Sequence, residues 1–256
     1  MSLKYASNQL ERCCHVKDLL VFEHQIGHRR EVIPVITEYT RTALHSGPQG
    51  EYEFFRARAA HLGASGSTFH TWHNQVSVTV CHKTKQVKIG PTGQLIMNKR
   101  GIGLGPALMA CVITWLQKHD VHDYTIDPGS LSEVDAKTVA AREQRNRFYM
   151  AFGFQLSTIS TSLTGIDVVE GNFTAANVGA LTVPERYQDQ LKPWFVFEDS
   201  LKDERESGVR CLDELKTIDR WTHGKSWLGR WLLNYMGWPV RFATRHMHKR
   251  KAWEPK

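Results

Sequence analysis

The feature that most constrains this chain is a glycine-rich turn between an expected strand and an expected helix. A short apolar strand is predicted over Gln94 to Met97, and the turn Arg100 to Gly105 (RGIGLG) follows it almost directly. Glycines at alternate positions allow a sharp turn and a close approach of the backbone to a ligand. The first N–H groups of the following helix have no intrahelical partner, and the helix dipole favours negative charge there. Strand, turn and helix together predict an anion-binding loop.

The residues after the turn predict an amphipathic helix. Its apolar stripe consists of Leu108, Met109, Val112, Ile113 and Leu116. Pro106 suits the first helical turn, because its missing N–H would have no intrahelical partner there. The turn is not the dinucleotide fingerprint G-x-G-x-x-G, and no Gly-Lys-Ser/Thr follows it as a P-loop requires. Those two kinds of phosphate site are therefore excluded.

Strands and helices alternate around this turn, which indicates an α/β (α+β) chain. Val76 to Val80 alternates with period two, and Val87 to Ile89 continues the pattern. Tyr124 to Asp127 predicts the next strand. Ser132, with Asp135 three residues later, resembles a capping box, and a helix is expected from there to about Ala151. Trp194 to Phe197 is predicted as a short buried strand, whereas residues 10–63 are expected to be mostly helical.

A second motif follows the turn by some 45 residues. Phe148 to Phe154 reads FYMAFGF, at the end of the next expected helix. Arg100 to Gly105 resembles the [R/Q]-x-x-G-x-[G/A] signature of the GCN5-related N-acetyltransferase family, and FYMAFGF is similar to that family's second signature, [L/F]-Y-x-x-x-G-F. The motifs stand in the family's order with an expected strand between them, and the resemblance covers roughly residues 70–170. It implies a mixed, twisted central sheet flanked by helices.

The resemblance also implies acetyl-CoA as co-substrate and assigns residues to it. The backbone of Leu95, Ile96 and Met97 would pair with the pantetheine arm as though it were another strand. Arg100 would lie near the phosphates, and the pyrophosphate would be held by the N–H groups of Gly101, Ile102, Gly103, Leu104 and Gly105. Tyr149 matches the position that protonates the leaving thiolate, and its ordinary pKa near 10 keeps it protonated at pH 7.

The sequence departs from the family's pattern in places that bear on chemistry. Pro106 stands where the family has an N–H donor, and Arg142 stands where it often has Asn. The expected strand before the turn holds no acid, so Asp127 is the candidate general base and Glu143 the second choice. Asp127 is equally explained as a cap of the Pro128-Gly129 turn. Arg100 could merely cap its strand, and Tyr149 could merely pack between helix and sheet.

The net charge of +7 is concentrated at one end. Residues 220–256 hold nine Lys/Arg and one acid, a net +8, so the first 219 residues carry about −1. Five of the eight tryptophans also lie there, and Trp227 to Tyr235 forms an apolar helical stripe. Three explanations stay open: packing on the body or a second subunit in a homodimer, contact with an anionic membrane surface, or binding of nucleic acid.

Cysteine usage and hydropathy bear on the compartment. The five cysteines are odd in number and form no CxxC pair, which argues against a disulfide framework or a zinc site. No signal-peptide core occupies the N-terminus, and the uncharged stretch from Gly101 to Gln117 is too short to span a membrane. A cytoplasmic protein without a bound metal is expected.

The sequence thus predicts three regions: a helical segment over 1–65, an acyl-CoA-binding core over 66–200 and a charged, basic, Trp-rich extension over 201–256. The expected function is N-acyl transfer, most simply acetyl transfer, from acetyl-CoA to an amine of a small molecule, a protein or a tRNA. The alternative is an inactive scaffold of the same fold whose basic tail binds nucleic acid or a membrane surface. The pattern does not identify the acceptor.

Overall fold

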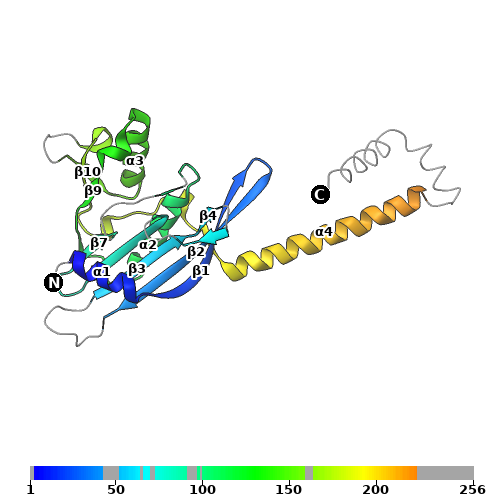
Figure 1. Ribbon diagram of the computed structural model, residues 1–256, viewed down its shortest axis with the longest axis horizontal. Helices are drawn as coiled ribbons and strands as arrows, with labels where there is room; N and C mark the ends of the chain where they lie inside the picture. Colours follow the sequence, from blue (N-terminus) through cyan, green and yellow to red (C-terminus); the bar gives the residue numbers. More distant parts are fainter. Residues whose placement is uncertain are drawn as a thin grey trace. The chain divides into compact units, whose positions relative to one another are not determined.

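A computed structural model describes residues 3–42, 52–63, 66–69, 73–90, 97–98, 100–158 and 164–223 (Figure 1). The chain divides into two compact units, Met1–Phe197 and Glu198–Lys256. The expected boundary near residue 65 falls inside the first unit. The Trp-rich stripe and most of the basic tail lie outside the described residues.

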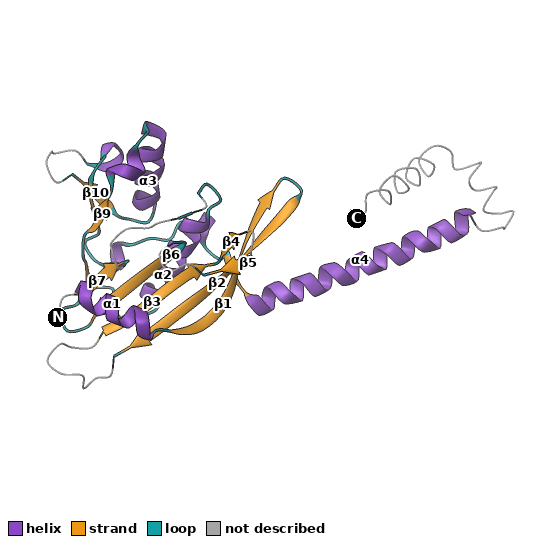
Figure 2. Cartoon of the chain, viewed as in Figure 1, coloured by secondary structure: helices purple, strands orange, loops and turns teal. Residues whose placement is uncertain are grey.

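The first unit is built on a mixed sheet of seven strands in the order β12-β1-β2-β3-β6-β7-β8 (Figure 2). Neighbouring strands are antiparallel except β7 and β8, which are parallel. The strands span His15–Ile26 (β1), Arg29–Arg41 (β2), Tyr52–Ala59 (β3), Gln75–Cys81 (β6), Gln86–Ile89 (β7), Thr125–Ile126 (β8) and Leu191–Pro193 (β12). The predictions of mixed α/β class and of strands at 76–80 and 87–89 are confirmed.

The N-terminal region contradicts its predicted helical character. Only α1 (Leu3–Cys13) is helical there, whereas β1, β2 and β3 form the middle of the sheet. The alternation was hidden because both faces of these strands are partly buried, so apolar residues occur at mixed spacings. Phe54 and Phe55 show this directly, since they are both buried but in two different clusters, against α1 and α2 respectively.

The two faces of the sheet have different chemistry. Val76, Val78 and Val80 are buried in the main core with the apolar stripe of α2 (Leu104–Gln117). On the other face Arg56 is buried and donates to Glu38 over 2.7 Å, and α1 adds Glu11 to the same network. The apolar face therefore fixes α2, and with it the glycine-rich turn that precedes the helix.

The second motif ends directly before a strand of a smaller sheet. Its order is β10-β11-β9, formed by Gln155–Ser157, Gly171–Thr174 and Gly129–Leu131. Helix α3 (Val139–Ala151) is capped by the Thr138 hydroxyl, which accepts from the Ala141 N–H. The predicted cap at Ser132 instead begins a short 3₁₀ helix, η1 (Glu133–Ala136). The end of the helix at Ala151 is confirmed, and Gly153 follows in the left-handed region with φ +88°.

The remaining elements are short, except for the last helix. They are the hairpin strands β4 (His61–Gly63) and β5 (Gly66–Thr68) and the 3₁₀ turns η2 (Gly165–Asp167), η3 (Val178–Ala180) and η4 (Glu185–Tyr187). Helix α4 (Trp194–His223) begins where a strand was predicted; the strand preceding it, β12, ends at Pro193. No helix in the described ranges has the length and apolar composition of a membrane span.

Candidate functional site

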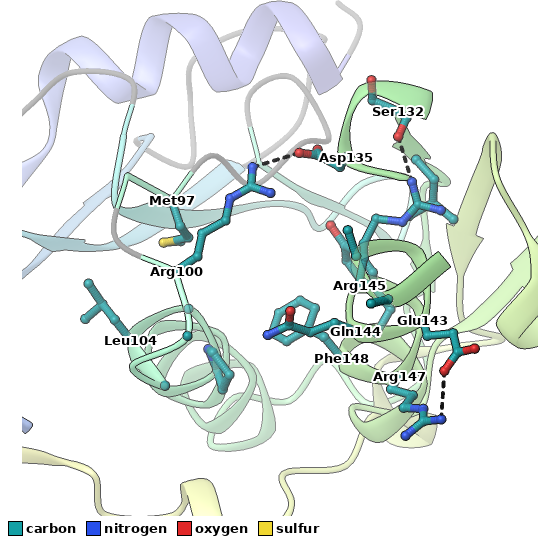
Figure 3. A pocket seen from close by; sticks show the side chains of 18 of the residues that line it. Met97, Arg100, Leu104, Ser132, Asp135, Glu143, Gln144, Arg145, Arg147 and Phe148 are labelled. Atoms are coloured by element: carbon teal, nitrogen blue, oxygen red, sulfur yellow. Dashed lines mark hydrogen bonds and ion pairs between the residues drawn. The ribbon is translucent and has the colours of Figure 1, made fainter. Parts of the chain in front are cut away.

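A cavity of about 650 Å³ lies between the glycine-rich turn and α3 (Figure 3). One wall is the turn and the first residues of α2, which we call the α2 wall. The opposite wall is α3 with the segment of β9 and η1 that precedes it, which we call the α3 wall. Both motifs singled out in the sequence therefore face one space. Its volume is in the range of small-ligand and cofactor sites.

The glycines of the α2 wall leave its backbone uncovered by side chains. Gly101 and Gly103 have φ +83° and +87°, which a glycine adopts without strain. Gly103 is the N-cap residue of α2, and no side chain caps this end. The first intrahelical bond runs from Ala107 N–H to the Gly103 carbonyl, and Pro106 has no N–H. The N–H groups of Leu104 and Gly105 have no intrahelical partner and no hydrogen bond to another described residue.

The charges around the cavity favour an anion. Its described lining includes four arginines against two carboxylates, a net +2, and the first turn of α2 contains no acid to offset the helix dipole. The charged residues are Arg100, Arg145, Arg147, Arg186, Asp135 and Glu143. Arg147 and Glu143 pair with each other over 2.9 Å on α3.

Tyr149 lies on the α3 wall and is closely packed. It is 5% exposed, and its ring stacks on Phe173 with centroids 4.2 Å apart. Phe148 and Phe154 contact the same ring edge-on. Burial raises the pKa of Tyr149 well above its ordinary value, only partly offset by the nearby charge of Arg145. The hydroxyl is therefore protonated at every physiological pH.

The α3 wall is held together by Arg145 and Asn146. Arg145 donates to the carbonyls of Ser132, Val168 and Val169 over 2.6–2.9 Å. Asn146 is fully buried and donates to the carbonyls of Ile166 and Val168, each over 2.8 Å. The two side chains thus tie α3 to the segments on either side of it. Sequence reasoning missed both, because their partners are backbone groups 13 to 24 residues away.

One ion pair links the two walls. Arg100 Nη2 lies 2.8 Å from Asp135 Oδ1, on η1 (Figure 3). Asp135 was noticed in the sequence only as part of a cap with Ser132. The Ser132 hydroxyl does cap η1 by accepting from the Val134 N–H, but the Asp135 carboxylate points to Arg100 instead.

Most of the predicted ligand-binding residues meet at this cavity. The cavity is lined by Met97, Arg100, Gly101, Gly103, Leu104, Gly105 and Tyr149. Ile102 packs against the core instead, and Leu95 and Ile96 lie outside the described residues. Asp127 is absent from the described lining; its N–H extends the β7–β8 ladder by donating to the Val87 carbonyl. Among the described residues no cluster of His, Cys, Asp and Glu could hold a metal ion.

The comparisons with known proteins identify no family for this chain. No family model, no curated protein and no solved structure matches this chain. The function is therefore inferred from the cavity itself.

Proposed function

We propose that this protein is an acyl-CoA-dependent N-acyltransferase, with acetyl-CoA as the acyl donor and an amine as the acceptor. The observation that carries the proposal is the acid-free, uncapped start of α2, which opens with its glycine-rich turn onto a cavity of suitable volume. The resemblance of both motifs to the GCN5-related N-acetyltransferases supports it, since both face that cavity. Five free cysteines agree with a reducing, cytoplasmic setting.

The residues present suit the phosphate portion of such a donor. The N–H groups of Leu104 and Gly105 and the guanidinium of Arg100 are the donors for a pyrophosphate. Acetyl-CoA would supply an acetyl group already activated as a thioester. Met97 lines the cavity beside this wall and is one of the three residues predicted to pair with the pantetheine arm.

Tyr149 provides a hydroxyl on the opposite wall. With a pKa above 10 it is a weaker acid than a thiol, whose ordinary pKa is about 8.5. Its role is therefore to donate a hydrogen bond to a departing thiolate, and complete proton transfer to that thiolate would be uphill. This refines the general-acid role implied by the family.

The candidate general base lies outside the described lining of the cavity. Both carboxylates in the described lining, Asp135 and Glu143, are paired with arginines. Asp127 stays the candidate, because it lies three residues before Ser130 on the chain that forms the wall. Asp127→Asn should lower kcat/KM and leave coenzyme A affinity unchanged. Loss of affinity would instead indicate a structural role in the turn.

The decisive test of the site is Gly105→Asp. Gly105 is the second residue of α2, where a carboxylate stabilises the helix through its dipole. The same carboxylate would repel a pyrophosphate, so folding should be kept while affinity for acetyl-CoA falls at least about tenfold. Calorimetry measures both variants, and Gly208→Asp on α4, where a side chain meets no neighbour, is the matched control.

Acyl transfer itself is tested by mass spectrometry of proteins, tRNA and metabolites from cells with and without the protein. Appearance of an acetylated species that requires Tyr149 supports the proposal. If acetyl-CoA binds but no acceptor is acetylated, and Tyr149→Phe changes nothing, the inactive-scaffold alternative is favoured. Its tail function is tested separately by deleting residues 224–256 and measuring binding to polyanions and anionic vesicles.

A further inference from the structure

The η1 segment lies at the surface of the α3 wall. None of its four residues is buried, and Val134 is 68% exposed. At its start, Arg145 donates to the Ser132 carbonyl over 2.6 Å. Further along, Asp135 pairs with Arg100 over 2.8 Å, and this pair connects η1 to the glycine-rich turn on the other wall (Figure 3).

Arg100 has two competing uses. Its guanidinium lies at the beginning of the turn whose N–H groups are the anion donors of the cavity, yet it is occupied by a carboxylate of the same protein. The other arginines in the described lining are engaged elsewhere: Arg145 on backbone carbonyls, Arg147 on Glu143 and Arg186 over the Tyr187 ring. A bound anion that used Arg100 would have to replace Asp135.

We propose that Asp135 is a specificity-determining residue that sets the charge a ligand needs in order to enter this cavity. The inference rests on the proposed function for the identity of the ligand, but it concerns only how anions are selected. A singly charged ligand group gains nothing over the carboxylate it displaces. A pyrophosphate brings more charge and also contacts the N–H groups of α2, so it displaces Asp135 where a smaller anion does not.

The pair is well suited to exchange. The Arg100 side chain is 64% exposed and that of Asp135 is 35% exposed, so solvent screens the pair and its net contribution to stability is small. Since η1 buries none of its residues, releasing Asp135 costs little packing. The same carboxylate, once released, leaves a negative charge at the rim of the cavity, where a cationic amine acceptor would be attracted.

The experiment measures how three proteins discriminate between two probe anions. Wild type, Asp135→Asn and Asp167→Asn are titrated by calorimetry with inorganic pyrophosphate and with inorganic phosphate. Asp167 is the matched control, because it loses the same charge and also pairs with an arginine, Arg142 over 3.4 Å, away from the cavity lining. The Asp135→Asn variant should bind phosphate about five- to tenfold more tightly than wild type does. Its affinity for pyrophosphate should rise by a smaller factor, so the ratio of the pyrophosphate affinity to the phosphate affinity should fall.

The same titrations in an Arg100→Gln background test whether Asp135 acts through Arg100. There Asp135→Asn should give no more gain than Asp167→Asn, because its effect acts through Arg100. Equal gains from Asp135→Asn and Asp167→Asn in the protein that keeps Arg100, or no binding of pyrophosphate to any variant, would overturn the inference. Acetyl-CoA turnover is measured separately. If the protein turns over acetyl-CoA but Asp135→Asn does not change the anion preference, only this inference is rejected. If Asp135→Asn changes the anion preference but no turnover occurs, only the proposed acyltransferase function is rejected.

Discussion

The two walls of the cavity differ in what supplies their chemistry. The α2 wall offers backbone N–H groups from a glycine-rich turn, and no atom of the described residues lies within 4 Å of the position that a Cβ at Gly101 would take. The α3 wall offers side chains, and these are packed: Tyr149 stacks on Phe173, and Asn146 is completely buried. One wall is open and ready for a ligand, whereas the other is part of the core.

This difference predicts how each wall responds to substitution. A change on the α2 wall adds atoms to open space, so it should alter ligand binding more than folding. A change on the α3 wall removes contacts or hydrogen bonds from the interior, so it should reduce stability first and activity as a consequence. Each prediction below tests this separation, beginning with the largest expected effect.

Phe173→Ala should destabilise the protein by about 4 kcal/mol, because it opens a cavity beneath Tyr149. Phe173 is fully buried and contacts both Tyr149 and Phe154. Urea unfolding followed by tryptophan fluorescence measures the change. Phe195→Ala is the control, since Phe195 is 66% exposed and its loss should cost less than about 1 kcal/mol. Similar effects at both positions would contradict a core role for the α3 wall.

Arg145→Met should destabilise the protein by about 3 kcal/mol, because the methionine fills similar space but leaves the Ser132 and Val169 carbonyls without their donor and removes one of the two donors to the Val168 carbonyl. Thermal unfolding measures this loss. Arg147→Met, two residues further along α3 and 70% exposed, is the matched control and should change stability by less than about 0.5 kcal/mol. If Arg145→Met left stability intact but removed ligand binding, the arginine would belong to the site and the comparison of walls would fail.

The α2 wall was largely predictable from sequence, because its features are local. The turn, the start of the helix near Pro106 and the strand at Val76 to Val80 are all encoded within a few residues of where they occur. Backbone chemistry needs only glycine at positions of positive φ, as Gly101 and Gly103 show. Tyr149 was also found, since its motif ends the helix with Gly153.

The rest depends on contacts between residues far apart in the chain. The partners of Arg145 and Asn146 lie 13 to 24 residues away in the chain, on both sides of α3, so no local pattern identifies them. Asp135 pairs with Arg100 across 35 residues, which hid it behind the local cap pattern. The first strands were mistaken for helices because Phe54 and Arg56 on one face are buried like Phe55 on the other, which removes the polar alternation.

Gly103→Ala tests the α2 wall without adding charge. The added methyl group would meet no atom closer than 3.8 Å, so its cost comes from the left-handed backbone and should be about 1 kcal/mol. Gly105→Ala has no such strain, because its new methyl group makes an ordinary contact with Met97 at 3.5 Å, and it should stabilise α2 by about 0.5 kcal/mol. Denaturant midpoints of the pair measure the difference. Equal midpoints would show that the turn does not need glycine at 103.

Tyr149→Phe tests the α3 wall through the pH dependence of stability. At pH 7 its effect on the free energy of unfolding should be the smallest of these predictions. There the hydroxyl is protonated in both the folded and the unfolded chain, so stability should change by less than about 1 kcal/mol. Above about pH 10 the unfolded chain ionises its tyrosines, whereas burial keeps the proton on Tyr149 in the folded protein. The folded state then binds the extra proton, and stability falls as pH rises.

The variant lacks this group, so it should lose less stability than wild type, by up to about 1.4 kcal/mol for each pH unit above 10. Urea unfolding at pH 8, 10 and 11 measures the two slopes. Tyr39, Tyr52 and Tyr124 also have raised pKa values through burial, so wild type and variant should both weaken, and only the difference reports Tyr149. Parallel slopes would mean that Tyr149 ionises as freely as in the unfolded chain. In that case the α3 wall is open to solvent at its hydroxyl, and the contrast with the α2 wall is lost.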